Sequence, residues 1–310
     1  MNCSIVIRTY NEEKHIGRLL ERIRRQTLND VEIIIVDSGS TDGTVSVAEA
    51  FGARIVKIAS VEFTFGRSLN FGVQAATREL VVIASAHVYP IYPDWLESLL
   101  SPLKDQKVAL AYGKQRAPES ANFSEQQIFH QWYPATSLPR QSTAFCNNAN
   151  AAIRKSLWEK NPYDETLTGL EDLAWAKWAK EQGYDIAYVA EAEIIHVHNE
   201  TPQGVFNRYC REAMAFKQIY PEAHFNLYDF VRLTTMNILS DLWHAARERV
   251  LWKNISSIFR FRFMQFHGTR MGYRESGLLT PQLRETFYYA RERKPMDGAR
   301  RDVEPIRYNK

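Results

Sequence analysis

Two histidines two residues apart are the clearest candidate ligands in the chain. His196 and His198 lie in the segment HVHNE on an expected strand, so both imidazoles would point to the same face of a sheet. Imidazole is a common ligand of divalent transition metals, so a pair of this kind can hold a metal ion. The same sequence would arise if one histidine were packed in the core and the other exposed, so the pair alone is compatible with a metal site and with a purely structural role.

Two adjacent carboxylates, Glu171 and Asp172, could carry out proton transfer. They stand in the segment GLEDLAW at the start of an expected helix. A carboxylate held there can take a proton from an attacking hydroxyl group. Acidic residues also stabilise helix N-termini through the helix dipole, so a purely structural role is the alternative.

Three further polar segments each follow a hydrophobic stretch. They are TYNEE at residues 9–13, VDSGSTDGT at residues 36–44, and the triplet Ser85-Ala86-His87. A carboxylate in the second segment could accept hydrogen bonds from a pyrimidine imide or from ribose hydroxyls. Each segment also has a purely structural explanation: a helix N-terminus for the first, an Asx turn with a helix cap for the second, and a capping serine with a packed histidine for the third.

Hydrophobic periodicity places these polar segments at the ends of strands. Residues 3–86 alternate short apolar runs with helical spacing in the order β-α-β-α-β-α-β, which predicts a parallel sheet with helices on both faces. Residues 184–200 predict two short strands, whereas residues 115–142 show no clear period and predict an irregular segment. Because ligands bind at the carboxyl ends of the strands in such sheets, the polar segments should meet in one crevice.

The pattern changes from Pro202 onward. Long helical stretches rich in arginine and aromatic residues follow, at 203–221, 226–252, 255–273 and 280–294. We therefore expect an α/β domain over residues 1–202 and a helical C-terminal extension over residues 203–310. The extension could make peripheral contact with an anionic membrane, or form a lid or a homodimer interface whose arginines extend along apolar surface.

The composition fits an ordinary globular protein in a reducing compartment. The formal net charge of +3 is too small to indicate a nucleic-acid partner, and the chain has no basic run or reader motif for one. Cys3, Cys146 and Cys210 are odd in number and widely spaced, which predicts free thiols and a cytoplasmic location. The chain shows no signal peptide and no uninterrupted apolar stretch of about 18 residues, so no membrane-spanning helix is expected.

The order of these segments resembles family 2 glycosyltransferases of the GT-A fold. The resemblance covers roughly residues 2–220 and is especially close in FCNNANAAIRKSLWEKNPYDETLTGLEDLAWAKWAKEQGYDIAYVAEAEIIHVH. It implies the Rossmann-like, mostly parallel sheet flanked by helices of nucleotide-diphospho-sugar transferases. It also implies an inverting enzyme that moves a sugar from such a donor to a hydroxyl of a glycan or lipid-linked acceptor, with Asp172 as general base beside Glu171.

The resemblance also assigns contacts to the nucleotide-sugar donor. The first loop, the turn after the second strand, a segment near the diphosphate and the end of the fourth strand supply Thr9, Tyr10, Asn11, Glu12, Asp37, Gly39, Ser40, Arg67, Asn70, Ser85, Ala86 and His87. Among these, Asp37 is the expected contact to the base, and Arg67 and Asn70 are the candidates at the diphosphate.

The fourth strand departs from the family pattern. Family members normally carry Asp-x-Asp where this chain has Ser85-Ala86-His87, whereas the related GalNAc transferases that start mucin chains carry Asp-x-His. His87 would then bind Mn²⁺ or Mg²⁺ together with His196 or His198, and imidazole favours Mn²⁺. The alternative is a metal-independent enzyme in which His87 or Arg67 takes the diphosphate charge.

Two functions from different classes follow from these residues. The first is an active glycosyltransferase of bacterial surface-polysaccharide synthesis, with the acceptor entering near residues 115–150. The second is a non-catalytic nucleotide-sugar-binding protein with a degenerate metal site, against which the intact Glu171–Asp172 pair and the paired histidines argue. A nucleotidyltransferase would need a glycine-rich basic loop after the first strand, which TYNEE lacks. The sequence leaves the donor sugar, the acceptor and the oligomeric state open.

Overall fold

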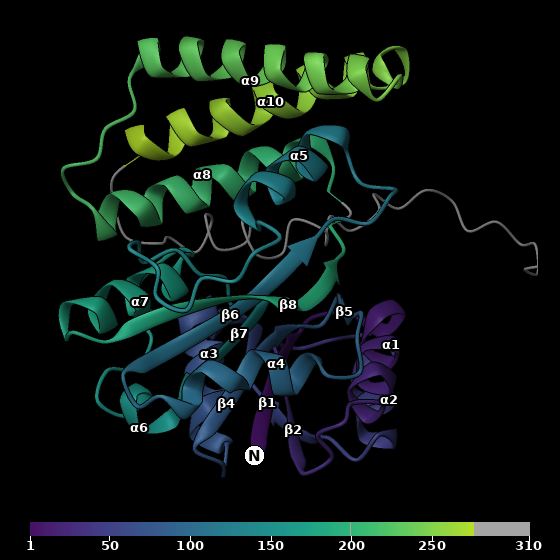
Figure 1. Ribbon diagram of the computed structural model, residues 1–310, viewed down its shortest axis with the longest axis vertical. Helices are drawn as coiled ribbons and strands as arrows, with labels where there is room; N and C mark the ends of the chain where they lie inside the picture. The colour runs from purple at the N-terminus through teal and green to yellow at the C-terminus, as the bar shows by residue number, and fades with distance from the viewer. Residues whose placement is uncertain (199, 276–310) are drawn as a thin grey trace, which may run out of the picture.

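The structure is a computed structural model that describes residues 1–198 and 200–275. Figure 1 shows an α/β layer built on one sheet, with a stack of helices lying against one end of it. The strands are β1 (Cys3–Thr9), β2 (Val31–Asp37), β3 (Arg54–Lys57), β4 (Leu80–Ser85), β5 (Val88–Pro90), β6 (Val108–Arg116), β7 (Asn150–Arg154) and β8 (Asp185–His196). The α-helices are α1 (Glu13–Arg24), α2 (Thr44–Ala50), α3 (Phe65–Ala75), α4 (Trp95–Leu100), α5 (Phe123–Trp132), α6 (Lys155–Trp158), α7 (Glu171–Glu181), α8 (Pro202–Ile219), α9 (Leu227–Arg247) and α10 (Leu251–Arg274), and the 3₁₀ turns are η1 (Ser60–Glu62) and η2 (Ser101–Lys104). Among these described residues, no helix is both long and apolar enough to cross a membrane.

The sheet has the strand order β3-β2-β1-β4-β7-β6-β8-β5. Strands β1 to β4 pair in parallel, which confirms the predicted α/β sheet flanked by helices. However, β7 runs antiparallel to β4 and β6, and β5 runs antiparallel to β8, so the sheet is mixed. Strand direction depends on long-range pairing, which local hydrophobic periodicity does not record.

Two segments differ from the sequence-based expectation. Residues 185–196 form one strand, β8, and not two short strands, because a register shift opposite β6 interrupts the alternation without ending the strand. The segment 115–142 was expected to be irregular but contains α5, which packs against β6 on one side and against α9 and α10 on another. Burial on two sides removes the one-sided hydrophobic period that would have marked the helix.

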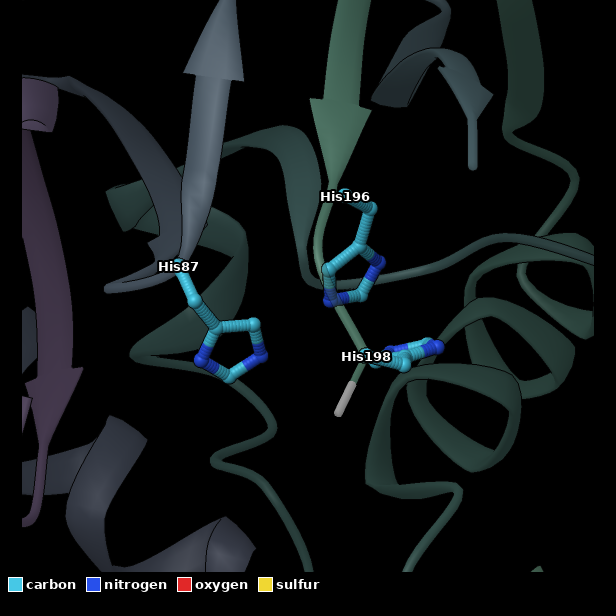
Figure 2. Close-up of side chains that lie close together, drawn as sticks. All are labelled: His87, His196 and His198. Atoms are coloured by element: carbon cyan, nitrogen blue, oxygen red, sulfur yellow. The ribbon is translucent and has the colours of Figure 1, made fainter. Parts of the chain in front are cut away.

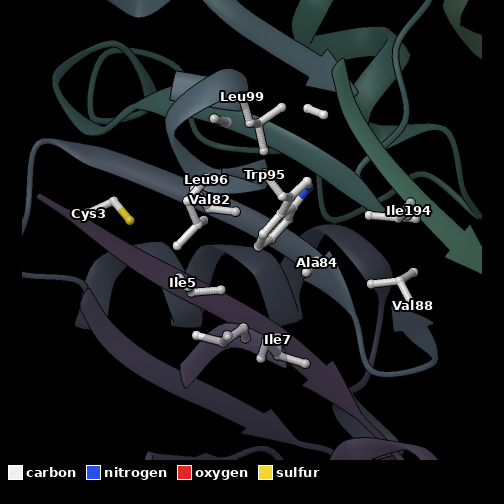
Figure 3. Close-up of a cluster of buried hydrophobic side chains, with 14 of the residues drawn as sticks. Cys3, Ile5, Ile7, Val82, Ala84, Val88, Trp95, Leu96, Leu99 and Ile194 are labelled. Carbon is white, nitrogen blue, oxygen red and sulfur yellow. The ribbon is translucent and has the colours of Figure 1, made fainter. Parts of the chain in front are cut away.

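Alternate side chains of the central strands pack against helices on opposite faces of the sheet. Ile5 of β1 faces α1, α2 and α4, whereas Val6 faces α3, α6 and α7. Figure 3 shows the first of these clusters around Trp95 of α4. The indole of Trp95 donates to Oδ1 of Asn150 in β7 over 2.9 Å, and Asn150 donates to the carbonyl of Ala192 in β8 over 2.8 Å. These bonds fix β7 and β8, which lead to the polar edge of the sheet.

The helix α10 crosses α8 in close contact. A side chain at Gly268 would collide with the carbonyl of Phe206, and one at Gly272 would collide with the carbonyl of Cys210. Glycine is therefore needed at both positions of α10 for the two backbones to approach.

A buried ion pair joins α9 to α10. Asp241 of α9 accepts two hydrogen bonds from the guanidinium of Arg262 in α10, over 2.7 and 2.9 Å, and the two residues are 1% and 4% exposed. Paired charges of this kind are held in place because neither partner can be buried alone without a large cost in solvation.

The helices α8, α9 and α10 correspond to three of the four helical segments predicted after Pro202, although α8 begins one residue earlier and α10 begins four residues earlier, at Leu251. The fourth, at residues 280–294, lies outside the described residues. The helix α8 begins at Pro202, and the hydroxyl of Thr201 accepts from the backbone N–H of Gly204. The division into domains at residues 202 and 203 stays a prediction.

The variant Asp241→Asn tests the buried ion pair. The substitution keeps the shape of the side chain but leaves the Arg262 guanidinium without its counter-charge, so we expect the free energy of unfolding to fall by about 3 kcal/mol. Urea denaturation followed by circular dichroism measures this change. The control is Glu21→Gln, which removes one partner of the exposed Arg25–Glu21 pair and should change stability by less than about 0.5 kcal/mol. Equal effects of the two substitutions would contradict a stabilising role for the buried pair.

Candidate active site

Three histidines from two separate segments meet at the carboxyl edge of the sheet, as Figure 2 shows. His87 lies in the turn between β4 and β5, His196 ends β8, and His198 follows two residues later. Antiparallel pairing of β5 with β8 brings them together, because Val88 lies opposite His196 and the Val197 N–H donates to the carbonyl of His87 over 3.1 Å. The ligand atoms that the three rings offer all lie within 4.8 Å of one another.

Each imidazole is oriented by an acceptor at its Nδ1 atom. The acceptors are Glu12 for His87 at 2.9 Å, Gln115 for His196 at 2.8 Å and Glu125 for His198 at 2.8 Å. An acceptor there places the proton on Nδ1 and leaves the lone pair of the neutral ring on Nε2. Histidines that bind metals in proteins are oriented in this way.

The Nε2 atom of His196 is buried and has no hydrogen-bond partner among the described residues. Burial, reinforced by the charges of His198 and His87, holds the pKa of His196 well below its usual value. Burial likewise lowers the pKa of His198. Both rings are therefore neutral at pH 7, and a buried lone pair beside two other imidazoles fits a metal ligand, since leaving it unused costs free energy.

Glu125 connects this cluster to the helical stack. Its carboxylate accepts from His198 and also from Arg208 of α8 at 3.3 Å, and Arg208 pairs with Glu200 at 2.9 Å. Burial alone would raise the pKa of Glu125, but the hydrogen bond from His198 and the charge of Arg208 outweigh burial and lower it. Glu125 therefore stays ionised and holds His198 in a single orientation.

Glu171 and Asp172 begin α7 after a residue in a strained conformation. Leu170, the N-cap, has a left-handed backbone φ of +56°. Glu171 forms an ion pair with Arg8 of β1 at 3.3 Å, and both carboxylates are buried. The ion pair ties the start of α7 to the carboxyl end of the first strand.

Asp172 has the properties of a base that works near neutral pH. Burial, together with the negative charge of Glu171, raises the pKa of Asp172 to about 7. Its Oδ2 atom accepts from the backbone N–H of Asn148 over 3.0 Å. The next residue, Ala149, accepts at its carbonyl from the N–H of Ser85 over 3.4 Å, so one short loop joins Asp172 to the turn that bears His87.

Hydrogen bonds join the loops that follow β1 and β2. Asp37 accepts from the backbone N–H groups of Gly39 and Ser40 over 3.0 Å each, and from the hydroxyl of Thr9 over 3.2 Å. The N–H of Asn11 donates to the hydroxyl of Ser40 over 2.9 Å. Asp37 thus forms the Asx turn that the sequence left as an alternative, and its contact to a base stays a prediction.

Arg67 and Asn70 of α3 both bind a neighbouring loop of the protein. Asn70 donates to Glu165 and to the carbonyl of Tyr163, each over 2.9 Å. Arg67 pairs with Glu165 at 3.2 Å and with Glu62 at 3.6 Å. Their assignment to the diphosphate stays a prediction.

Three other assigned residues lie along the same edge of the sheet. Tyr10 is half-buried in the first loop, Ser85 is half-buried at the end of β4, and Ala86 is buried in the turn that follows. Their contacts to a donor stay predictions.

The structure adds four residues that the sequence did not single out: Arg8, Gln115, Glu125 and Arg208. Gln115 and Glu125 come from the segment without a clear period, and Arg208 comes from the helical extension. Arg8 carried the one available signal, since it is a charge inside the apolar strand SIVIRT.

Residues 4–161, about half of the chain, match the family described as Glycosyl transferase family 2. The chain belongs to glycosyl transferase family 2. It is 28% identical over 221 residues to the O-antigen chain rhamnosyltransferase RfbN of Salmonella typhimurium, which covers 67% of this chain and 70% of that relative. It is 29% identical to the O-antigen chain rhamnosyltransferase WbaN of Salmonella anatum, over 66% of this chain and 69% of the relative.

Solved structures show the same fold. The mannosyltransferase PcManGT from Pyrobaculum calidifontis, in complex with GDP-Man and Mn²⁺, matches with a TM-score of 0.60 and 18% identity over 88% of each chain. TarS 1–349 of S. aureus in complex with UDP matches with a TM-score of 0.51 and 16% identity, over 88% of this chain and 90% of TarS 1–349. These likenesses confirm the predicted GT-A fold, and family membership confirms that the chain is a glycosyltransferase.

The variant Asp172→Asn should change how stability depends on pH. Because folding raises the pKa of Asp172 to about 7, this group stabilises the folded chain fully below about pH 4, and the stabilisation is lost as pH rises through 7. The asparagine of the variant does not titrate, so the variant does not lose stability in this way. The melting temperature of the variant minus that of wild type should therefore be several degrees higher at pH 8 than at pH 5. Differential scanning fluorimetry measures this, with the exposed Asp94→Asn as control. A difference that does not vary with pH would contradict the raised pKa.

Proposed function

We propose that this glycosyltransferase moves a sugar from a nucleotide-diphospho-sugar to a hydroxyl of a glycan or lipid-linked acceptor, with inversion at the anomeric carbon. The observation that carries the proposal is the buried Asp172, joined through one short loop to the turn that bears His87. A single displacement needs a base for the attacking hydroxyl and a site for the departing diphosphate, and this edge of the sheet offers candidates for both.

In the proposed reaction Asp172 takes the proton of the acceptor hydroxyl. The oxygen attacks the anomeric carbon from the side opposite the diphosphate, and the bond from that carbon to the diphosphate oxygen breaks. Glu171 supports this role, because its negative charge helps to raise the pKa of Asp172 toward the working pH. Arg8 holds Glu171 in place for that purpose.

The three-histidine cluster fits a divalent cation. His87, His196 and His198 would hold the ion through Nε2, and the unpaired, buried Nε2 of His196 is the observation that supports this. When bound, a cation of this kind neutralises charge on the leaving diphosphate. Imidazole ligands favour Mn²⁺ over Mg²⁺, so Mn²⁺ is the proposed ion.

The metal-independent alternative depends on a free cation near the diphosphate. Arg67 is poorly suited to neutralise the diphosphate, because Glu165 and Glu62 already pair with its guanidinium. His87 is hydrogen-bonded at Nδ1 to Glu12, and the neutral form of its ring offers a lone pair at Nε2 that suits a metal better than an anion.

A cavity of about 290 Å³ beside the cluster is the proposed acceptor site. It is lined in part by Lys114, Gln115, Phe129 and Tyr133, and the first two stand on β6 and the others at α5. Gln115 and Phe129 also contact the ring of His196, so the cavity adjoins the cluster. Aromatic faces stack on sugar rings, and the polar groups can bind hydroxyls. The two O-antigen relatives support a glycan acceptor of bacterial surface-polysaccharide synthesis.

The variant Asp172→Asn tests the base. Turnover should fall by about 10²–10⁴-fold, because the amide cannot accept the proton, while the donor affinity stays unchanged. A thermal-shift screen of UDP-, dTDP-, GDP- and CMP-sugars first identifies the donor, and calorimetry then measures its affinity. The control Asp94→Asn should keep wild-type turnover. Near-normal turnover of Asp172→Asn, or a product with the anomeric configuration of the donor by proton NMR, would contradict the mechanism.

The variants His198→Ala and Glu125→Gln test the cation site without measuring activity. Titration of Mn²⁺ followed by electron paramagnetic resonance should show affinity lowered by roughly 10–100-fold in Glu125→Gln, and by more in His198→Ala. His224→Ala, an exposed histidine outside the cluster, is the control and should bind Mn²⁺ as wild type does. If all four proteins bind Mn²⁺ equally, the three histidines do not form its site.

A further inference from the structure

The helix α9 presents an apolar stripe to solvent. Tyr228, Val231, Leu239 and Trp243 lie on one face of the helix, with the exposed Thr235 between the second and the third, at intervals of three or four residues. Among the described residues, nine of the fourteen exposed large apolar side chains belong to α9 and α10. A concentration of this kind is typical of a surface that binds another apolar phase.

Aromatic side chains gather at the connection between the two helices. Trp243, near the end of α9, is 54% exposed, and Trp252, at the start of α10, is 86% exposed. Phe259 and Phe263 continue the exposed apolar surface along α10. Tryptophan has an apolar ring with one polar N–H, so it is most stable at the boundary between lipid and water.

The same two helices carry an excess of positive charge. Residues 227–275 contain eight Lys and Arg against four Asp and Glu, a net charge of +4, whereas the whole chain has +3. One charge of each sign is spent in the buried Asp241–Arg262 pair. Arg247, Lys253 and Arg260 are among the basic residues of this segment that are exposed to solvent.

We propose that the face formed by the exposed side chains of α9 and α10 docks on an anionic lipid bilayer. The apolar stripe and the tryptophans would enter the interfacial region, and the basic side chains would contact lipid phosphates. A second copy of the chain is the less suitable occupant, because a symmetric contact would set this positively charged face against an identical positively charged face. The inference does not depend on the proposed reaction.

The fold places this face away from the active site. Figure 1 shows α9 as the outermost layer, with α10 and α8 between it and the sheet. The opposite side of α9 is fixed by Asp241 and Ala245, both buried against α10 and its neighbours. With 21 residues, α9 offers a docking edge about 30 Å long.

Vesicle co-sedimentation of the full chain tests the proposal. The chain should bind vesicles of mixed phosphatidylcholine and phosphatidylglycerol, bind pure phosphatidylcholine much more weakly, and dissociate at high salt. The variants Trp243→Ala/Trp252→Ala and Lys253→Gln/Arg260→Gln should each lower the partition coefficient by about tenfold. Their melting temperatures and donor hydrolysis should match wild type, since all four side chains are exposed.

Matched controls remove the same features from the α/β layer. Tyr92→Ala removes an exposed aromatic ring, and Lys104→Gln/Lys160→Gln removes two exposed charges, so both should bind vesicles as wild type does. Three results would overturn the proposal: no binding to anionic vesicles, equal binding to neutral ones, or equal loss in the control variants. A fourth such result would come from sedimentation velocity. It would be a wild-type dimer that dissociates in the Trp243→Ala/Trp252→Ala variant although this variant still binds vesicles as wild type does.

Discussion

The pairing of β5 with β8 is the constraint on which the site depends. Only Ala86 and His87 separate β4 from β5 along the chain, yet β7, β6 and β8 lie between these two strands in the sheet. The sheet must therefore curl until the end of β8 returns beside the end of β4. Because Val88 lies opposite His196, the two-residue turn faces the end of β8, and the three imidazoles meet there. A sheet that stayed open would leave His87 far from the other two histidines.

The helical stack supports this arrangement and is bound to it across the predicted domain boundary. Arg208 of α8 holds Glu125, and Glu125 holds His198. The hydroxyl of Thr168, close before α7, donates to the carbonyl of Arg211 in α8, so the same helix is also fixed beside the Glu171–Asp172 pair. The sequence pattern changes at residue 202, but residues before and after this position are joined by the ion pair and the hydrogen bond described above.

The sequence could predict the parts of the site that local patterns encode. A polar strand end located His87, two same-face positions on one strand located His196 and His198, and a helix start located Asp172. The structure brings the three histidines together and joins Asp172 to the turn that bears His87. What the sequence could not predict depends on long-range contacts. The antiparallel β7 and β5 left no local trace, and α5 lost its period because it is buried on two sides. Glu125 was therefore missed, although it orients one of the predicted ligands.

The charge distribution around the three histidines explains how imidazoles could hold a cation at a position where the resemblance implies carboxylates. The family pattern described in the sequence analysis has aspartates at the positions of Ser85 and His87, so by that resemblance the residues that would touch the proposed cation carry less negative charge here. Glu12 and Glu125 restore carboxylates one hydrogen bond further out, behind His87 and His198. The Coulomb attraction between a cation and these carboxylates is weaker because the distance is longer, whereas each carboxylate makes the lone pair of its imidazole more basic. A site of this kind would hold its ion more by lone-pair donation than by charge, and this favours Mn²⁺, which binds nitrogen ligands better than Mg²⁺ does.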